Sequence, residues 1–174
     1  MLDSASGVRK TDLAVIILQK NEKLHIKRCL EKLAPLAPRQ IFVVDCFSTD
    51  GSDKIAAEMG ATVVYHAWPG LYAQQFNWAL DNLPIKASWI LRLDADEYLY
   101  PETCEEVQRL VTSGGLPPDV TSLSLSLVFS AGTGSVSVER RISPWCGSSS
   151  VASGAVRTGR WTSMSSRARA GIIV

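Results

Sequence analysis

The stretch Trp89-Ile-Leu-Arg-Leu-Asp-Ala-Asp-Glu97 places a short, mostly apolar run directly before three carboxylates. Such a run fits a strand that is buried on both faces of a parallel sheet. Because like charges repel one another, three carboxylates at a strand end favour a bound cation, and Mg²⁺ or Mn²⁺ suits carboxylate oxygens. A D-x-D is common, however, and taken alone this one is better interpreted as a solvated acidic turn.

Three further apolar runs precede this strand, and each is followed by a segment with helical spacing. Pro101 sits in the first turn of a last predicted helix. The resulting alternation of strands and helices, with short connections, predicts an α/β fold with helices on both faces of the sheet. The predicted strands are Leu13–Leu18, Ile41–Val44, Thr62–Tyr65 and Trp89–Leu93, and the predicted helices are Glu22–Leu33, Ser52–Met59, Leu71–Leu83 and Pro101–Val111.

Polar residues follow the first two strands, at the edge where ligands bind in such sheets. Asp45 has little packing reason to follow an apolar strand, so we expect it to accept hydrogen bonds from a base or ribose. Glu22, after Asn21, is equally compatible with a helix-dipole role and with nucleotide binding. Asp50 and Ser52 are candidates for capping the next helix, and for Ser52 this is the preferred interpretation.

The third predicted helix carries the amides Gln74, Gln75 and Asn77, which on a helix are usually solvated. The nearby Trp68 and Trp78 are better interpreted as core or cover than as platforms for a nucleobase. The four cysteines form no C-x-x-C pair and have no histidine cluster beside them, which argues against a zinc site or a disulfide framework. They are Cys29, Cys46, Cys104 and Cys146, and buried free thiols are expected for the first two.

The order and spacing of these segments resemble family 2 glycosyltransferases, and most of all the bacterial branch that adds sugars to the lipopolysaccharide core. The resemblance covers about residues 12–112. Cys46 departs slightly from it, since a serine is usual there. The matching segments are Ile16-Ile-Leu-Gln-Lys-Asn-Glu22, Phe42-Val-Val-Asp-Cys-Phe-Ser-Thr-Asp-Gly51, Gln75-Phe-Asn-Trp-Ala-Leu80 and Trp89-Ile-Leu-Arg-Leu-Asp-Ala-Asp-Glu97.

The resemblance implies a GT-A fold, which is Rossmann-like, a nucleotide-diphospho-sugar donor, most simply a UDP-sugar, and inversion at the anomeric carbon. It also implies Mg²⁺ or Mn²⁺ and a glycan or lipid-linked acceptor. By motif, Glu22 and Asp45 contact the nucleoside, Asp94 contacts the ribose or diphosphate, and Asp96 binds the metal. The full expected set is Asn21, Glu22, Asp45, Asp50, Gln75, Asn77 and Asp94 for the nucleotide-sugar, and Asp94 and Asp96 for the metal.

Composition divides the 174 residues into unequal parts. We expect a flexible segment at 1–11, an incomplete nucleotide-sugar-binding domain at 12–125, and a Ser/Gly/Arg-rich tail at 126–174 that is irregular, disordered or non-native. The net charge of +1 suggests no nucleic-acid partner. Without an apolar run of spanning or signal-peptide type, the expected location is the cytoplasm, with peripheral association with the inner membrane as an option.

The tail also raises the question of the catalytic base, which this family supplies from an acid downstream of the D-x-D, often in an Asp-Glu-His-like motif. No acid follows Glu139, so no catalytic residue is assigned. Residues 120–174 contain no Asp, Asn, Gln, Lys, His or Tyr. Beginning each codon at the third base of the printed one forces Asp across Trp161 and Thr162, and permits Glu and His after it.

The same frame forces Val across Trp145 and Cys146, and permits a Leu-Arg-Leu-Phe-Arg-Arg-like stretch that is typical of the family. The sequence therefore favours a glycosyltransferase fragment whose residues from about 125 are out of frame or truncated. Two alternatives stay open: a complete nucleotidyltransferase-like enzyme that uses the same D-x-D, and a non-catalytic nucleotide-binding fragment.

Overall fold

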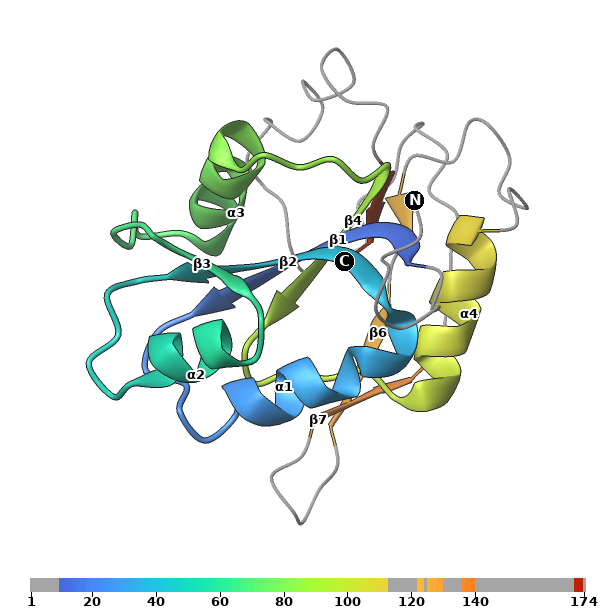
Figure 1. Ribbon diagram of the computed structural model, residues 1–174, viewed down its shortest axis with the longest axis horizontal. Coiled ribbons are helices and arrows are strands. Elements are labelled where there is room, and N and C mark those ends of the chain that lie inside the picture. The colour runs from blue at the N-terminus through green and yellow to red at the C-terminus, as the bar shows by residue number, and fades with distance from the viewer. Residues whose placement is uncertain (1–9, 113–121, 124, 130–135, 140–170, 174) are drawn as a thin grey trace.

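The computed structural model describes residues 10–112, 122–123, 125–129, 136–139 and 171–173. Six strands form one sheet in the order β3-β2-β1-β4-β8-β5, and all neighbouring pairs are parallel (Figure 1). A separate antiparallel pair joins β6 to β7. The strands are β1 Thr11–Gln19, β2 Pro38–Asp45, β3 Thr62–Tyr65, β4 Trp89–Asp94, β5 Ser122–Leu123, β6 Ser126–Phe129, β7 Val136–Glu139 and β8 Gly171–Ile173.

The strand order turns back at the centre of the sheet. The chain moves outward from β1 through β2 to β3 and then returns to place β4 on the other side of β1. The register sets Leu18 beside Asp94 and Gln19 beside Asp45, so the carboxyl ends of β1, β2 and β4 lie level with one another. In doubly wound sheets, ligands bind beyond the carboxyl ends of the strands at such a reversal.

Helices cover both faces of the sheet, as the alternating pattern predicts (Figure 1). One core lies under α1, α2 and α4 and contains Val15, Ile17 and Leu91. The other lies under α3 and contains Ile16 and Phe76. The helices are α1 Ile26–Lys32, α2 Ser52–Glu58, α3 Tyr72–Asn82 and α4 Pro101–Thr112, with a short 3-10 turn at Ala34–Leu36.

The apolar runs locate the strands well because both faces of this sheet are buried. The main difference is at α1, which begins at Ile26 rather than at Glu22. Asn21 has a φ of 56° and is left-handed, so the chain turns before the helix can start. The amides of His25 and Ile26 both donate to the Glu22 carbonyl in this turn.

The expectation of an irregular tail is corrected at three short segments, because β6, β7 and β8 all lie within residues 126–174. Val136–Glu139 pairs with β6, and Gly171–Ile173 lies between β4 and β5. In Val136–Glu139 valines alternate with polar residues, which is the pattern of a strand with one apolar and one polar face. Gly171–Ile173 is largely apolar, which is the pattern of a strand in a parallel sheet. The rest of the predicted tail lies outside the described residues, and so do residues 1–9 of the predicted flexible segment 1–11. Thr11 is a correction to that segment, because it is buried and begins β1.

Gly60 follows the C-terminal end of α2. Its φ is 87°, and its amide donates to the Ala57 carbonyl at 3.0 Å. We expect Gly60→Ala to lower the free energy of unfolding by about 1–2 kcal/mol, because a Cβ disfavours the left-handed conformation. Urea unfolding measures this. Lys54→Ala, on the exposed side of α2, is the control and should change stability by less than about 0.5 kcal/mol.

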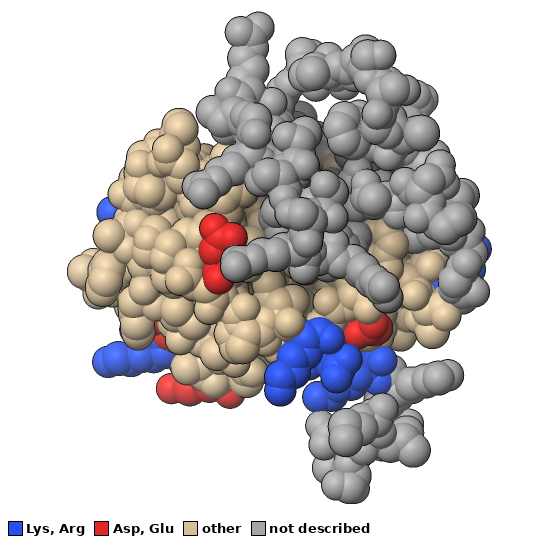
Figure 2. All heavy atoms as spheres, turned by 90° about the horizontal axis from the view of Figure 1, so that it is seen from above, with Lys and Arg blue, Asp and Glu red and all other residues tan. Residues whose placement is uncertain are grey.

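None of the helices in the described part of the chain combines the length and the apolar character needed to cross a bilayer. Seen from above, the described surface is mostly uncharged, and its charged side chains lie mainly along one margin (Figure 2).

Candidate functional site

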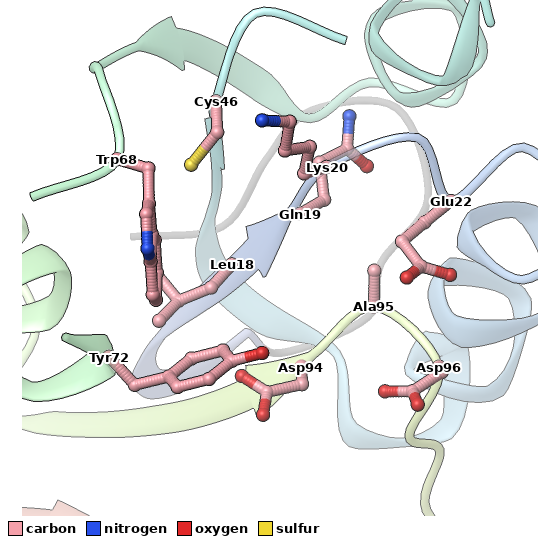
Figure 3. Close-up of a pocket in the computed structure, with 10 residues that line it drawn as sticks. All are labelled: Leu18, Gln19, Lys20, Glu22, Cys46, Trp68, Tyr72, Asp94, Ala95 and Asp96. Carbon is pink, nitrogen blue, oxygen red and sulfur yellow. The ribbon is translucent and has the colours of Figure 1, made fainter. Parts of the chain in front are cut away.

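A pocket of about 370 Å³ lies beyond the carboxyl ends of β1 and β4, at the reversal in strand order (Figure 3). This volume is at the lower end of the range for small-molecule sites. Carboxylates line one side, and an aromatic pair lines the other (Figure 3). The lining residues are Leu18, Gln19, Lys20, Glu22, Cys46, Trp68, Tyr72, Asp94, Ala95 and Asp96.

The two carboxylates of the D-x-D differ in their surroundings. Asp94 is half-buried, and both of its oxygens accept from one guanidinium nitrogen of Arg92, at 2.9 and 3.1 Å. Burial raises the pKa of the Asp94 carboxyl, and the charge of Arg92 opposes that rise. Asp96 is exposed, and among the described residues none donates a hydrogen bond to its carboxylate. Asp96 is therefore the carboxylate with open coordination.

Glu97 supports this turn rather than lining the pocket. Its Oε2 accepts from the backbone amide of Asp94 at 2.9 Å, and burial raises the pKa of its carboxyl. The third acid of the predicted cluster therefore stabilises the backbone that presents Asp94 and Asp96.

Glu22 brings a further carboxylate to the pocket from the β1 side. Burial raises the pKa of Glu22, and the negative charge of Asp96 raises it further. In the described part of the chain no three acidic, histidine or cysteine side chains form a metal cage. The donor set nevertheless fits Mg²⁺ or Mn²⁺, because such ions are often bound by one or two carboxylates and completed by substrate phosphates.

Asp45 does not reach the pocket itself. It is fully buried, and its Oδ1 accepts from the Ser48 amide while its Oδ2 accepts from Nε2 of Gln19, both at 2.7 Å. Gln19 does line the pocket, and its Oε1 has no partner among the described residues. In this structure the influence of Asp45 on a ligand therefore passes through Gln19.

Asn21 and Asp50 connect two loops. The Asn21 Oδ1 accepts from the Thr49 amide at 2.8 Å, and the Asn21 amide donates to Ser48 Oγ at the same distance. Asp50 accepts from the Lys23 amide at 2.9 Å and from the amide of Ser52 at 3.0 Å. The loop after β1 is thus fixed to the loop after β2. Nucleotide binding by either residue stays a prediction.

Gln75 and Asn77 lie on α3, outside the residues that line the pocket. Gln75 is fully buried rather than solvated, which corrects the general expectation for helix amides. Its Oε1 lies 2.7 Å from Nδ1 of His66, and its Nε2 donates to the Cys46 sulfur at 3.2 Å. Gln75 therefore supports the pocket wall at Cys46, whereas Asn77 is half-buried on the same helix.

The family model for glycosyl transferase family 2 matches residues 14–116, the whole segment that carries these side chains. The chain belongs to glycosyl transferase family 2. A glycosyltransferase of uncharacterised activity from Rickettsia bellii is 34% identical over 101 residues, which are 58% of this chain and 33% of the relative. A glycosyltransferase from Rickettsia felis is also 34% identical over 101 residues, and this match covers 58% of the present chain and 34% of the relative. The chain thus spans about a third of these relatives.

Solved structures of similar proteins confirm the GT-A fold. Glucosyl-3-phosphoglycerate synthase from Mycobacterium tuberculosis, in complex with Mn²⁺, UDP and glucosyl-3-phosphoglycerate, superposes with a TM-score of 0.52 at 20% identity, over 66% of this chain and 43% of that one. Mannosyl-3-phosphoglycerate synthase from Rubrobacter xylanophilus gives 0.53 at 19% identity, over 66% and 39%. At these identities the likeness shows the fold alone.

Sequence reasoning missed several pocket residues of this glycosyltransferase domain. Trp68 was interpreted as core or cover, but it is 41% exposed and lines the pocket with Tyr72. Gln19 and Lys20 also line it, and their position between an apolar strand and Asn21 was the available signal. Trp68 begins the Trp-Pro-Gly segment after β3 and Tyr72 lies just beyond it, and no periodicity predicts the path of this segment.

Three cysteines of the domain are buried free thiols, Cys29, Cys46 and Cys104, as expected for the first two; Cys146 lies outside the described residues. Burial raises the pKa of Cys29 to about 12 and that of Cys104 to about 11. Both thiols are therefore protonated at pH 8. In a Cys46→Ser/Cys146→Ser variant we expect no fast reaction with a disulfide reagent until urea unfolds the protein. Rapid labelling of the folded variant would contradict this burial.

Proposed function

We propose that this domain binds a UDP-sugar together with Mg²⁺ or Mn²⁺ and transfers the sugar to a glycan or lipid-linked acceptor. One observation carries the proposal: Asp94, Asp96 and Glu22 converge on a single pocket at the strand reversal of a family 2 fold. Lys20 adds a positive charge to the same pocket, suited to a diphosphate. A related fold from Mycobacterium tuberculosis carries Mn²⁺ and UDP, which supports this choice of ligands.

The side chains divide the work by their surroundings. When bound, the ion would be held through Asp96 and would neutralise charge on the departing diphosphate. Asp94, oriented by Arg92, accepts a hydrogen bond from a ribose or sugar hydroxyl. Gln19, held by Asp45, and Glu22 lie at the nucleoside end. Asn21 and Asp50 belong to the same binding surface, because their hydrogen bonds connect the loops after β1 and β2.

The proposed transfer is inverting. The acceptor oxygen attacks the anomeric carbon as the bond to the diphosphate breaks, UDP leaves with the electron pair, and a base takes the acceptor's proton. No acid follows Glu139, so we propose that residues from about 125 are read out of frame, and that the alternative frame supplies the Asp-Glu-His base segment. The proposed acceptor is a lipopolysaccharide-core or other envelope glycan, reached at the cytoplasmic face of the inner membrane.

Metal-dependent nucleotide binding tests the donor half of this proposal. We expect calorimetric titration with UDP, GDP and CDP to show tighter binding of at least UDP with Mn²⁺ or Mg²⁺ than with a chelator, because Asp96 would hold the ion and the ion's charge would favour a diphosphate in the same pocket. Circular dichroism verifies that the chelated protein stays folded. Absence of binding by the folded protein, or equal binding of all three nucleotides without metal, would contradict the proposal.

A further inference from the structure

We propose that Trp68 and Tyr72 form the subsite for the sugar ring of the donor. This inference rests on the proposed function, because it extends the same pocket. The two rings approach at 4.7 Å between centroids with 72° between their planes, and they form one corner of the pocket (Figure 3). They are 41% and 59% exposed, and Leu71 between them in sequence is 50% exposed. Clustered exposed apolar side chains with a polar rim are typical of binding sites.

The wall that faces this corner is polar. Asp94 lies across the pocket from the Trp68 ring and close to the Tyr72 side chain, while Lys20 and Glu22 lie farther along the rim (Figure 3). A pyranose presents apolar C–H groups on its ring faces and hydroxyl groups around its edge. It therefore matches a pocket with an aromatic wall and hydroxyl-accepting carboxylates on the other side. The available volume, about 370 Å³, accommodates a single hexose ring with adjoining phosphate.

The corner suits a nucleobase less well. The edge-to-face arrangement of the two rings leaves no parallel slot for a flat ring. A base also needs matched donors and acceptors along its edge, whereas the charged group beside the Tyr72 side chain is the Asp94 carboxylate (Figure 3). The side-chain amide of Gln19, whose Oε1 has no partner among the described residues, is held at the end of β1 by Asp45 instead.

One residue connects the two walls. Arg92 pairs with Asp94 at 2.9 Å, and its guanidinium carbon lies 6.0 Å from the centre of the Tyr72 ring. This distance is at the limit of a cation–π contact. Arg92 therefore lies between the aromatic corner and the carboxylate wall, and it orients Asp94 next to Tyr72.

The inference is tested by comparing UDP with sugar-bearing nucleotides. Calorimetry with Mn²⁺ measures the affinity for UDP, UDP-glucose, UDP-galactose and UDP-N-acetylglucosamine. We expect at least one UDP-sugar to bind more tightly than UDP. Trp68→Ala should weaken the binding of that UDP-sugar about tenfold, as truncation of an aromatic side chain that a ligand covers does. The affinity for UDP should stay within about twofold. Trp68→Phe should restore most of the difference, because it keeps an aromatic face.

Phe47→Ala is the matched control, because Phe47 is 60% exposed and does not line the pocket. It should leave the difference between UDP-sugar and UDP unchanged. Equal weakening of UDP and UDP-sugar by Trp68→Ala would place the nucleobase on the corner and overturn the inference. The inference would also be overturned if no UDP-sugar binds more tightly than UDP does, or if Trp68→Ala leaves the affinities for all ligands unchanged. In both of these cases the proposed function stands. If folded protein binds neither ligand, the proposed function fails first.

Discussion

Asp96→Asn is expected to weaken metal-dependent UDP binding by about tenfold or more, well beyond the roughly 0.5 kcal/mol of an ordinary surface change. Asp96 is exposed, lines the pocket and receives no hydrogen bond from the described residues. Its carboxylate is therefore available to a cation. Asparagine keeps the shape and removes the charge, so a hard ion loses its anionic ligand.

Asp81→Asn is the control for this change. Asp81 is an exposed carboxylate near the end of α3, outside the pocket. Titration with UDP in Mn²⁺ and in chelator, on both variants, separates loss of metal binding from loss of protein. If the two substitutions have the same effect, the D-x-D is a solvated acidic turn.

Restoring the alternative frame from about codon 125 is expected to raise the rate of sugar transfer by about a hundred- to ten-thousand-fold, the usual contribution of a positioned base. The chain as printed has Asp94, Asp96 and Glu22 at the pocket but no acid after Glu139. Without a base, the acceptor hydroxyl keeps its proton during attack. Transfer to a lipopolysaccharide-core acceptor, measured side by side for the printed and restored chains, gives the comparison.

A second restored chain, with the aspartate of its Asp-Glu-His segment changed to asparagine, is the control. It should bind UDP as the restored chain does and lose most of the gained activity. A printed chain that transfers sugar as fast as the restored one would show that the tail is native and that the base lies elsewhere. Reading the coding DNA around codon 125 tests the same point without an enzyme assay.

The strands, and the acids that follow them, could be predicted because each depends on local chemistry. A run such as Leu13–Leu18 has no polar residue to place on a solvated face, so it must be buried. A carboxylate such as Asp94, coming directly after such a run, lies at the carboxyl edge wherever the strand is placed in a parallel sheet. The pocket position of Asp94, Asp96 and Glu22 follows from these two facts.

The partners of the other site residues could not be predicted, because they depend on loop geometry. Asn21 and Phe47 both have φ values of 56°, and these turns direct the Asn21 side chain to another loop instead of the pocket. Both carboxylate oxygens of Asp45 accept hydrogen bonds, one from Gln19 and one from Ser48, which no spacing rule anticipates. The direction of Trp68 depends on the path after β3, which its neighbours Pro69 and Gly70 leave open.

The bonds between the two loops also determine how this site can be changed. Because Asn21 bonds to Ser48 and Thr49, and Lys23 bonds to Asp50, the loops after β1 and β2 form one cross-braced unit. Exchanging one loop alone for that of another glycosyltransferase would leave backbone amides without acceptors. A graft intended to alter nucleotide preference therefore has to transplant residues 20–23 and 46–52 together, as a single interchangeable cassette.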